Sequence, residues 1–197
     1  MNNVQERKLK VKDLILIGVF AIIYFIVLVA IGMMGMVPIL FLIYPTILGI
    51  VAGTIVMLFE AKVPKPGALF IFGMLSPLIM FFMGHTYVLP LGALVIMLIA
   101  ELIRKSGGYQ SLKKDILACA VFNVWICFSL MQMLLMYDTY KAMTESMMPQ
   151  GYFNALEKLI SWPSMLLVIL GALLGGYLGA LIGKKLLKKH FAKAGIA

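Results

Sequence analysis

The sequence predicts an all-α membrane protein, with residues 1–197 forming a single transmembrane domain built as a six-transmembrane-helix bundle. Two observations predict this class. The 197 residues are 63% hydrophobic and only 13% charged, and the mean hydropathy of +1.05 is far above that of a soluble domain. The apolar residues also form runs long enough to cross the roughly 30 Å of hydrocarbon in a bilayer.

Each predicted helix is an apolar run bounded by polar residues, glycine or proline. The first run follows a basic start and is too long for a secretory signal. The third follows a loop with Pro64 and Pro66, and the fourth has Pro90 in its first turn, where proline is tolerated. Polar residues in the segment 138–160 predict an outer loop with a short interfacial helix. The predicted helices cover about residues 14–34, 39–59, 67–83, 88–103, 115–137 and 161–183.

Basic residues lie almost entirely on one side of this arrangement. Four precede the first helix, two follow the second, four follow the fourth and five follow the sixth, so 15 of the 17 share the side of both termini. The opposite side holds only Lys141 and Lys158. Because cytoplasmic loops carry an excess of Lys and Arg, the N and C termini are predicted to be cytoplasmic. Membrane topology thus explains the net charge of +9, and no nucleic-acid partner is predicted.

Small residues recur at helical spacing in three of the predicted helices. In the last helix a glycine stands every four residues, and shorter small-residue pairs occur in the first two helices. Such faces permit close backbone approach in lipid. Two interpretations are open at this point, packing inside the bundle and docking of another subunit. The candidate partner-coupling residues are Gly18, Ala21, Gly49, Gly53, Gly171, Gly175, Gly179 and Gly183.

A small-molecule pocket is predicted in the outer half of the bundle. Six of the eight prolines fall there, and proline frees backbone carbonyls that need a partner in protein or water. Polar and aromatic residues collect at the same depth, as in small-molecule sites, although an interfacial belt of Tyr and Trp is the alternative. The loop 138–160 is a candidate lid. The candidate substrate-binding residues are Tyr44, His85, Thr86, Tyr87, Asn123, Gln132, Tyr137, Asp138 and Trp162.

The sequence indicates no catalytic, metal or cofactor site. No H-E-x-x-H, G-x-S-x-G or P-loop motif occurs. Cys119 and Cys127 share one apolar run and are expected to be core residues. The sixteen Met residues are expected to fill gaps in the packing. A soft-metal site is the second interpretation, and it ranks second because His85 and His190 are the only histidines that could assist. With few membrane-buried acids for ion coupling and no nucleotide motif, any primary energy must come from a partner.

The chain as a whole resembles the Trep_Strep family. The resemblance rests on six spans, cytoplasmic termini, a basic start, a long loop before the last helix, and the ending GGYLGALIGKKLLKKHFAKAGIA. Members are bacterial membrane proteins regarded as substrate-binding S components of energy-coupling-factor (ECF) transporters. The resemblance implies a multi-pass protein of the bacterial cell membrane. It also implies a coupling transmembrane protein and two cytoplasmic ABC ATPases as partners, and a vitamin-like or other small micronutrient as substrate.

One departure from the S-component pattern falls in the first helix. Many S components carry Ala-x-x-x-Ala there as the face that meets the coupling protein, whereas Gly18 and Ala21 are three apart and Ile22 takes the place of a second small residue. The expected function is capture of substrate near the outer face and delivery by reorientation against the coupling protein. The alternatives are a small membrane enzyme or protease, and a membrane scaffold without ligand.

Overall fold

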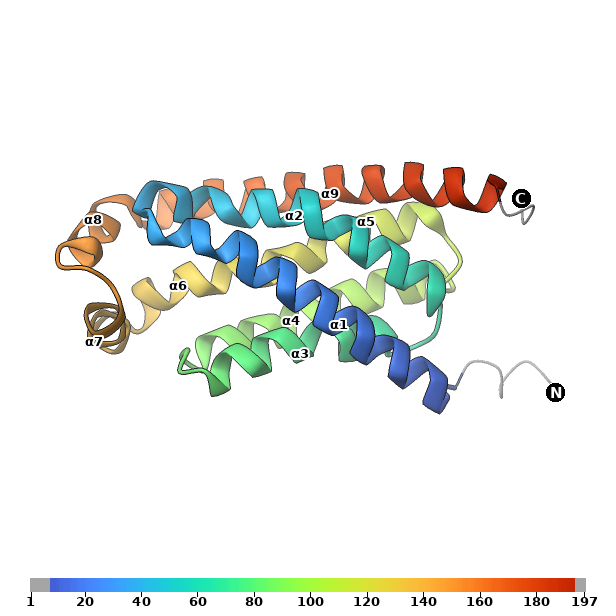
Figure 1. Ribbon diagram of the computed structural model, residues 1–197, viewed down its shortest axis with the longest axis horizontal. Coiled ribbons are helices and arrows are strands. Elements are labelled where there is room, and N and C mark those ends of the chain that lie inside the picture. The colour runs from blue at the N-terminus through green and yellow to red at the C-terminus, as the bar shows by residue number, and fades with distance from the viewer. Residues whose placement is uncertain (1–7, 194–197) are drawn as a thin grey trace.

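The computed structural model describes residues 8–193, with side chains through Lys188, and these residues are all-helical (Figure 1). Arg7 of the basic start, and the side chains of Lys189, His190 and Lys193 in the tail, lie outside the described residues. In chain order the elements are α1 (Val11–Gly32), the 3-10 helix η1 (Met33–Met36), α2 (Pro38–Lys62), α3 (Ala68–Phe82), α4 (Val88–Ser106), α5 (Leu112–Phe122), the 3-10 helix η2 (Asn123–Cys127), α6 (Phe128–Leu135), α7 (Tyr137–Met147), α8 (Tyr152–Leu159) and α9 (Trp162–Lys193).

The helices run along one long axis, so the bundle has two distinct ends (Figure 1). The first turn of α1, the last turns of α9 and the α2–α3 and α4–α5 connections lie at one of them, which we call the basic end because these segments carry the Lys and Arg clusters. The helices α7 and α8 lie at the other, which we call the α7–α8 end. The segment 138–160, predicted as a loop with one short helix, thus forms most of two helices.

Four helical stretches are long and apolar enough to cross a membrane, where the sequence predicted six spans. Within residues 8–193 they are Val11–Met36, Pro38–Lys62, Leu112–Leu135 and Trp162–Lys188. The helix α3 is apolar but has 15 residues, a length of about 22 Å, which is shorter than a bilayer core. The helix α4 carries Glu101, Arg104 and Lys105 toward its end. The two form a shorter α3–α4 hairpin beside the four long candidate spans.

The stretch α5–η2–α6 is the central element of the bundle and corresponds to the fifth predicted helix. In its apolar window 78% of the residues are buried, against 22% in α1. Trp125 is fully buried and donates from Nε1 to the hydroxyl of Tyr24 on α1. Asn123 donates to the carbonyl oxygens of Pro45 on α2 and Ala172 on α9, both at 2.8 Å. Polar side chains are tolerated at this depth because neighbouring helices supply their partners.

The helices α2 and α9 run in the same direction and pack backbone against backbone (Figure 1). A Cβ atom on Gly175 would collide with the carbonyl of Thr46, and one on Gly179 would collide with the carbonyl of Gly49. The glycine face of α9 is therefore covered by α2, which decides between the two interpretations in favour of internal packing. This corrects the docking role considered for six glycines, because other residues of the bundle pack against them. The six are Gly49, Gly53, Gly171, Gly175, Gly179 and Gly183.

The other two candidate coupling residues lie on α1. Ala21 is buried against the bundle, so it too is unavailable to a partner. Gly18 differs, because no atom lies within 4 Å of the position where its Cβ would stand. The exposed side chains of Ile15, Val19 and Ile22 flank it at helical spacing. The side of α1 that points away from the bundle is thus an open apolar face.

Buried and partly buried ion pairs hold the basic end together. Lys65 after α2 lies 2.6 Å from Asp13 on α1. The fully buried Arg104 of α4 lies 3.0 Å from Asp115 on α5 and 3.4 Å from Glu60 on α2. These contacts fix the connections between helices where the basic loops emerge.

Glu101 of α4 has a structural role at the same end. Its carboxylate accepts hydrogen bonds from the backbone N–H groups of Gly67, at 2.7 Å, and Phe70, at 3.2 Å. These groups belong to the start of α3, where the N–H donors lack partners within the helix and the dipole favours a negative charge. Glu101 therefore caps α3 and fixes the α3–α4 hairpin.

Candidate functional site

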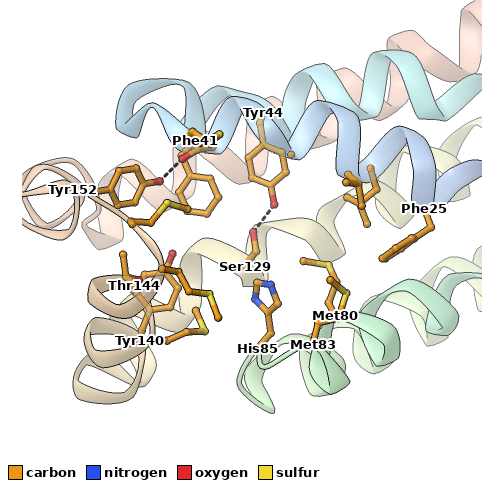
Figure 2. A pocket seen from close by; sticks show the side chains of 18 residues that line it. Phe25, Phe41, Tyr44, Met80, Met83, His85, Ser129, Tyr140, Thr144 and Tyr152 are labelled. Carbon is orange, nitrogen blue, oxygen red and sulfur yellow. Dashed lines mark hydrogen bonds between the residues drawn. The ribbon is translucent and has the colours of Figure 1, made fainter. Parts of the chain in front are cut away.

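A cavity of about 290 Å³ lies near the α7–α8 end, opposite the basic end (Figure 2). Its walls come from α1, η1, α2, α3, α6, α7 and α8, and from the turn between α3 and α4. The volume is close to the lower limit for pockets that hold small organic ligands, about 300–1,000 Å³. The bundle thus forms a partly open cavity of small-molecule size at one end.

Two helices each present one full face to the cavity. Residues spaced i, i+3, i+4 and i+7 share one side of a helix. In α1 these are Phe25, Leu28, Val29 and Gly32, and in α7 they are Tyr140, Met143, Thr144 and Met147. The helix α7 therefore lies over the cavity as an amphipathic roof, and its opposite face is exposed, as at Glu145.

The lining is apolar and uncharged, and it is rich in methionine. Six methionines contribute, together with the rings of Phe25 and Phe41 and three tyrosines. No Asp, Glu, Lys or Arg side chain lines the cavity among the described residues. The methionines are Met36, Met80, Met83, Met143, Met147 and Met148. Methionine is unbranched and polarisable, so it adapts to ligand shape and makes favourable contacts with aromatic rings.

A buried hydrogen-bond network forms the polar wall of the cavity. Gln132 on α6 accepts through Oε1 from the backbone N–H of Thr86, at 2.8 Å, and from its hydroxyl, at 2.9 Å. Through Nε2 it bonds to the carbonyl of Ser129, at 3.0 Å, and to Nδ1 of His85, at 3.3 Å. Gln132 is fully buried. It therefore ties the α3–α4 turn, which carries His85, to the central stretch.

This network assigns the proton on His85. A backbone N–H can only donate, so Thr86 fixes Oε1 of Gln132 on its own side and leaves Nε2 facing His85. Nδ1 of His85 then accepts, and the neutral ring carries its proton on Nε2. Burial lowers the pKa of His85 from its usual value of 6.5. The imidazole is thus neutral at pH 7, with an N–H donor on Nε2.

Hydroxyl groups complete the polar wall. Ser129 donates to the carbonyl of Ile126 at 2.7 Å, so the hydroxyl of Tyr44, 2.5 Å away, donates to Ser129 Oγ (Figure 2). The hydroxyl of Tyr152 on α8 donates to the carbonyl of Gly35 in η1. Burial raises the pKa of Tyr152 to about 12, so it stays a neutral donor. This bond attaches the α7–α8 segment to the α1–α2 connection.

The structure brings together some of the residues that the sequence predicted for the site. His85 and Tyr44 line the cavity, and Thr86 and Gln132 are buried directly behind them. The other predicted residues lie outside the cavity. Asn123 holds α2 and α9 deeper in the bundle. The exposed ones are Tyr87, Tyr137, Asp138 and Trp162, of which Tyr137 donates to Glu157.

The residues that sequence reasoning missed come mainly from α1, α3 and α7. The periodicity of Tyr140, Met143, Thr144 and Met147 was readable, but the polar residues between them led to the prediction of a loop. Met80 and Met83 sit in an apolar run that gave no site signal. Their position in the wall follows from the length of α3, which ends short of the α7–α8 end (Figure 1).

The titratable and thiol side chains of the bundle are dispersed. Among the described side chains, those of residues 8–188, no three of His, Cys, Asp or Glu come together as possible metal ligands. Cys119 and Cys127 are both buried and free. Each of their thiols faces backbone carbonyls of neighbouring helices.

The long apolar helices define an integral membrane protein. The family model described as hypothetical bacterial integral membrane protein (Trep_Strep) matches residues 11–193. The chain therefore belongs to the Trep_Strep family and is a bacterial integral membrane protein with several candidate spans. No curated protein and no solved structure matches the chain.

Proposed function

We propose that the chain is the substrate-capture (S) component of an ATP-driven ECF-type importer, and that it binds a small micronutrient in the cavity at the α7–α8 end. The observation that carries this proposal is the position of the cavity. It is uncharged, it is roofed by a helix, and it lies at the end opposite the basic loops. A binding site on the outer side is what a capture subunit requires.

The orientation follows from the positive-inside rule. The basic end faces the cytoplasm, so the α7–α8 end faces outward. In this arrangement α3 and α4 form the third and fourth membrane segments, which enter from the basic end and stop short of the α7–α8 end. Their hairpin is shorter than the other helices, which leaves room for the cavity at the outer side. Capping of α3 by Glu101 fixes the hairpin at the basic end.

The helices α7 and α8 act as the lid. They follow the last residue of α6 and join α9 through a short connection, so they can move without unfolding a membrane span. Tyr152 attaches the lid to the α1–α2 connection. Breaking this bond and lifting α7 would open the cavity to the outside.

The energy for import comes from partners, a coupling transmembrane protein and two cytoplasmic ABC ATPases. We assign the coupling protein to the lipid-facing side of α1 around Gly18, the side that points away from the bundle. It is open and apolar, and small at that position, whereas the glycine face of α9 is already covered. Close approach at a small residue is the usual means of helix association in lipid.

Affinity purification tests this function. The tagged protein is isolated from membranes of a bacterium that encodes it, and the associated proteins are quantified by mass spectrometry. The proposal predicts that a membrane protein and two ATPases copurify, and that a Gly18→Leu variant loses them while keeping its unfolding temperature. If no ATPase is enriched over an unrelated tagged membrane protein, the proposed function is wrong.

A further inference from the structure

We infer that the cavity takes an uncharged, largely apolar, planar heterocycle that carries a hydrogen-bond acceptor, and that the N–H of His85 Nε2 recognises this acceptor. The inference rests on the proposed function, because it names the substrate class of the same site. Its three parts, charge, shape and polar recognition, each rest on a separate observation.

The charge class follows from the lining. No Asp, Glu, Lys or Arg side chain of the described residues lines the cavity, and partial burial lowers the pKa of His85, which keeps its ring neutral at pH 7. A ligand with a net charge would lose its hydration without gaining an opposite charge, which is strongly unfavourable in a buried site. The nearby charged residues of the roof, Lys141 and Glu145, belong to faces of α7 other than the lining face.

The shape class follows from the apolar side chains. The rings of Phe41 and Tyr44 stack with an interplanar angle of 2° and centroids 5.3 Å apart, so this wall presents aromatic surface in a single orientation. Phe25 stands on the other side of the space (Figure 2). Methionine side chains fill the remaining walls, and thioethers contact aromatic rings favourably. Aromatic surfaces and soft thioethers suit a planar ring system better than a sugar, which would leave its hydroxyls unpaired.

Polar recognition is assigned to His85, because three of the hydroxyl donors in the lining already have acceptors. Tyr44 donates to Ser129, and Ser129 donates to the carbonyl of Ile126. Tyr152 donates to the carbonyl of Gly35. The remaining hydroxyls of the lining, those of Tyr140 and Thr144, belong to the roof helix α7 and not to the fixed wall that carries His85. Nε2 of His85 has no partner among residues 8–193. In Figure 2 the imidazole extends from the α3–α4 turn toward Ser129, so a carbonyl or ring nitrogen of the ligand can accept from it.

The test uses the intact protein in lipid nanodiscs and a small-molecule ultrafiltrate of yeast extract. Cation and anion exchange at neutral pH split the ultrafiltrate into cationic, anionic and neutral pools. Each pool is titrated against the protein while the thermal unfolding midpoint is measured. We expect the neutral pool to raise the midpoint and the two charged pools to leave it unchanged. Reversed-phase separation should then assign the effect to a compound with heteroaromatic absorbance.

Two variants test recognition by His85. His85→Phe keeps a planar ring without the donor, and we expect it to need about tenfold more of the active fraction for the same midpoint shift. Tyr87→Phe, a change in the same turn but outside the cavity, should titrate like the unaltered protein. The comparison of pools uses the unaltered protein, so it decides the charge class even if His85→Phe does not fold.

Several results would overturn the inference. The charge class is wrong if the anionic or the cationic pool raises the unfolding midpoint more than the neutral pool does; the cationic pool would also contain any soft metal ion. The inference also fails if the active neutral compound is a sugar, or if no pool raises the midpoint. An unchanged titration of a folded His85→Phe would remove the role of His85. The copurification of ATPases is measured independently, so a wrong substrate class and a wrong transporter assignment give different results.

Discussion

The amide of Gln132 joins the central helix of the bundle to the ring of His85, with Nε2 and Nδ1 separated by 3.3 Å. The same side chain holds the backbone of Thr86 through its oxygen. One buried residue therefore fixes both the position of the α3–α4 turn and the tautomer of the histidine at the cavity wall. Both effects can be measured.

Removing this amide should destabilise the protein. In Gln132→Ala the buried N–H and hydroxyl of Thr86 lose their acceptor, so we expect the free energy of unfolding to fall by about 1–3 kcal/mol. Ligand binding should weaken as well, because the His85 ring is no longer held. Denaturant titration in detergent measures the first effect. Tyr87→Ala, an exposed change in the same turn, is the matched control and should stay close to the unaltered protein.

The stability of the protein should decrease in mild acid through His85. Burial lowers the pKa of this group from 6.5 in the folded state, so the unfolded chain takes up a proton first as the pH falls. The stabilisation is complete above about pH 6.5 and is lost progressively as the pH falls toward the lower folded-state pKa. His85→Gln lacks this titration, so the difference between the two unfolding midpoints should shrink with falling pH. A difference that grows in acid would contradict the assignment.

The glycine interface between α2 and α9 should not accept larger side chains. Leucine at Gly179 would collide with the backbone carbonyl of Gly49, and overpacking of this kind costs about 1–3 kcal/mol or more. Gly18→Leu, on the open side of α1, should leave the unfolding temperature unchanged. We therefore expect low expression or a lowered unfolding temperature only for the α9 variant. Normal stability of Gly179→Leu would show that α9 does not pack on α2 in the membrane.

The topology predicts which ends of the helices are reachable from outside the cell. A membrane-impermeant maleimide should label Glu145→Cys in the roof helix α7 in intact cells, and Lys113→Cys only after the membrane is opened. Both positions are exposed, and the native Cys119 and Cys127 are buried, so their background should be low. Labelling of Lys113→Cys in intact cells would reverse the orientation and place the cavity on the cytoplasmic side.

Much of the fold was readable from local patterns. Apolar length predicted α1, α2 and the stretch α5–η2–α6, and the four-residue glycine spacing predicted a face for close packing on α9. What these patterns lack is the partner of each face. A glycine ridge packs equally well on its own chain or on another subunit, and only the matching Gly49 and Gly53 on α2 decide this.

The site was less readable, for a physical reason. Polar residues in an apolar chain attract attention, so His85 and Gln132 were predicted, but exposed polar residues such as Asp138 give the same signal. The cavity surface is instead made mainly by methionine and aromatic side chains, which are abundant throughout the sequence. They become a site only where the end of the short α3 and the roof helix α7 line the same cavity.

We propose that the chain captures a small molecule at the outer end for ATP-driven import, and a transport assay tests this function. The assay uses proteoliposomes that contain the protein together with its copurified coupling protein and ATPases. ATP is supplied on the side of the membrane that carries the ATPases. The compound from the active neutral fraction is followed across the membrane. We expect accumulation that requires both ATP and this protein, and that is reduced in the His85→Phe variant. Equal transport without ATP, or without this protein, would contradict it.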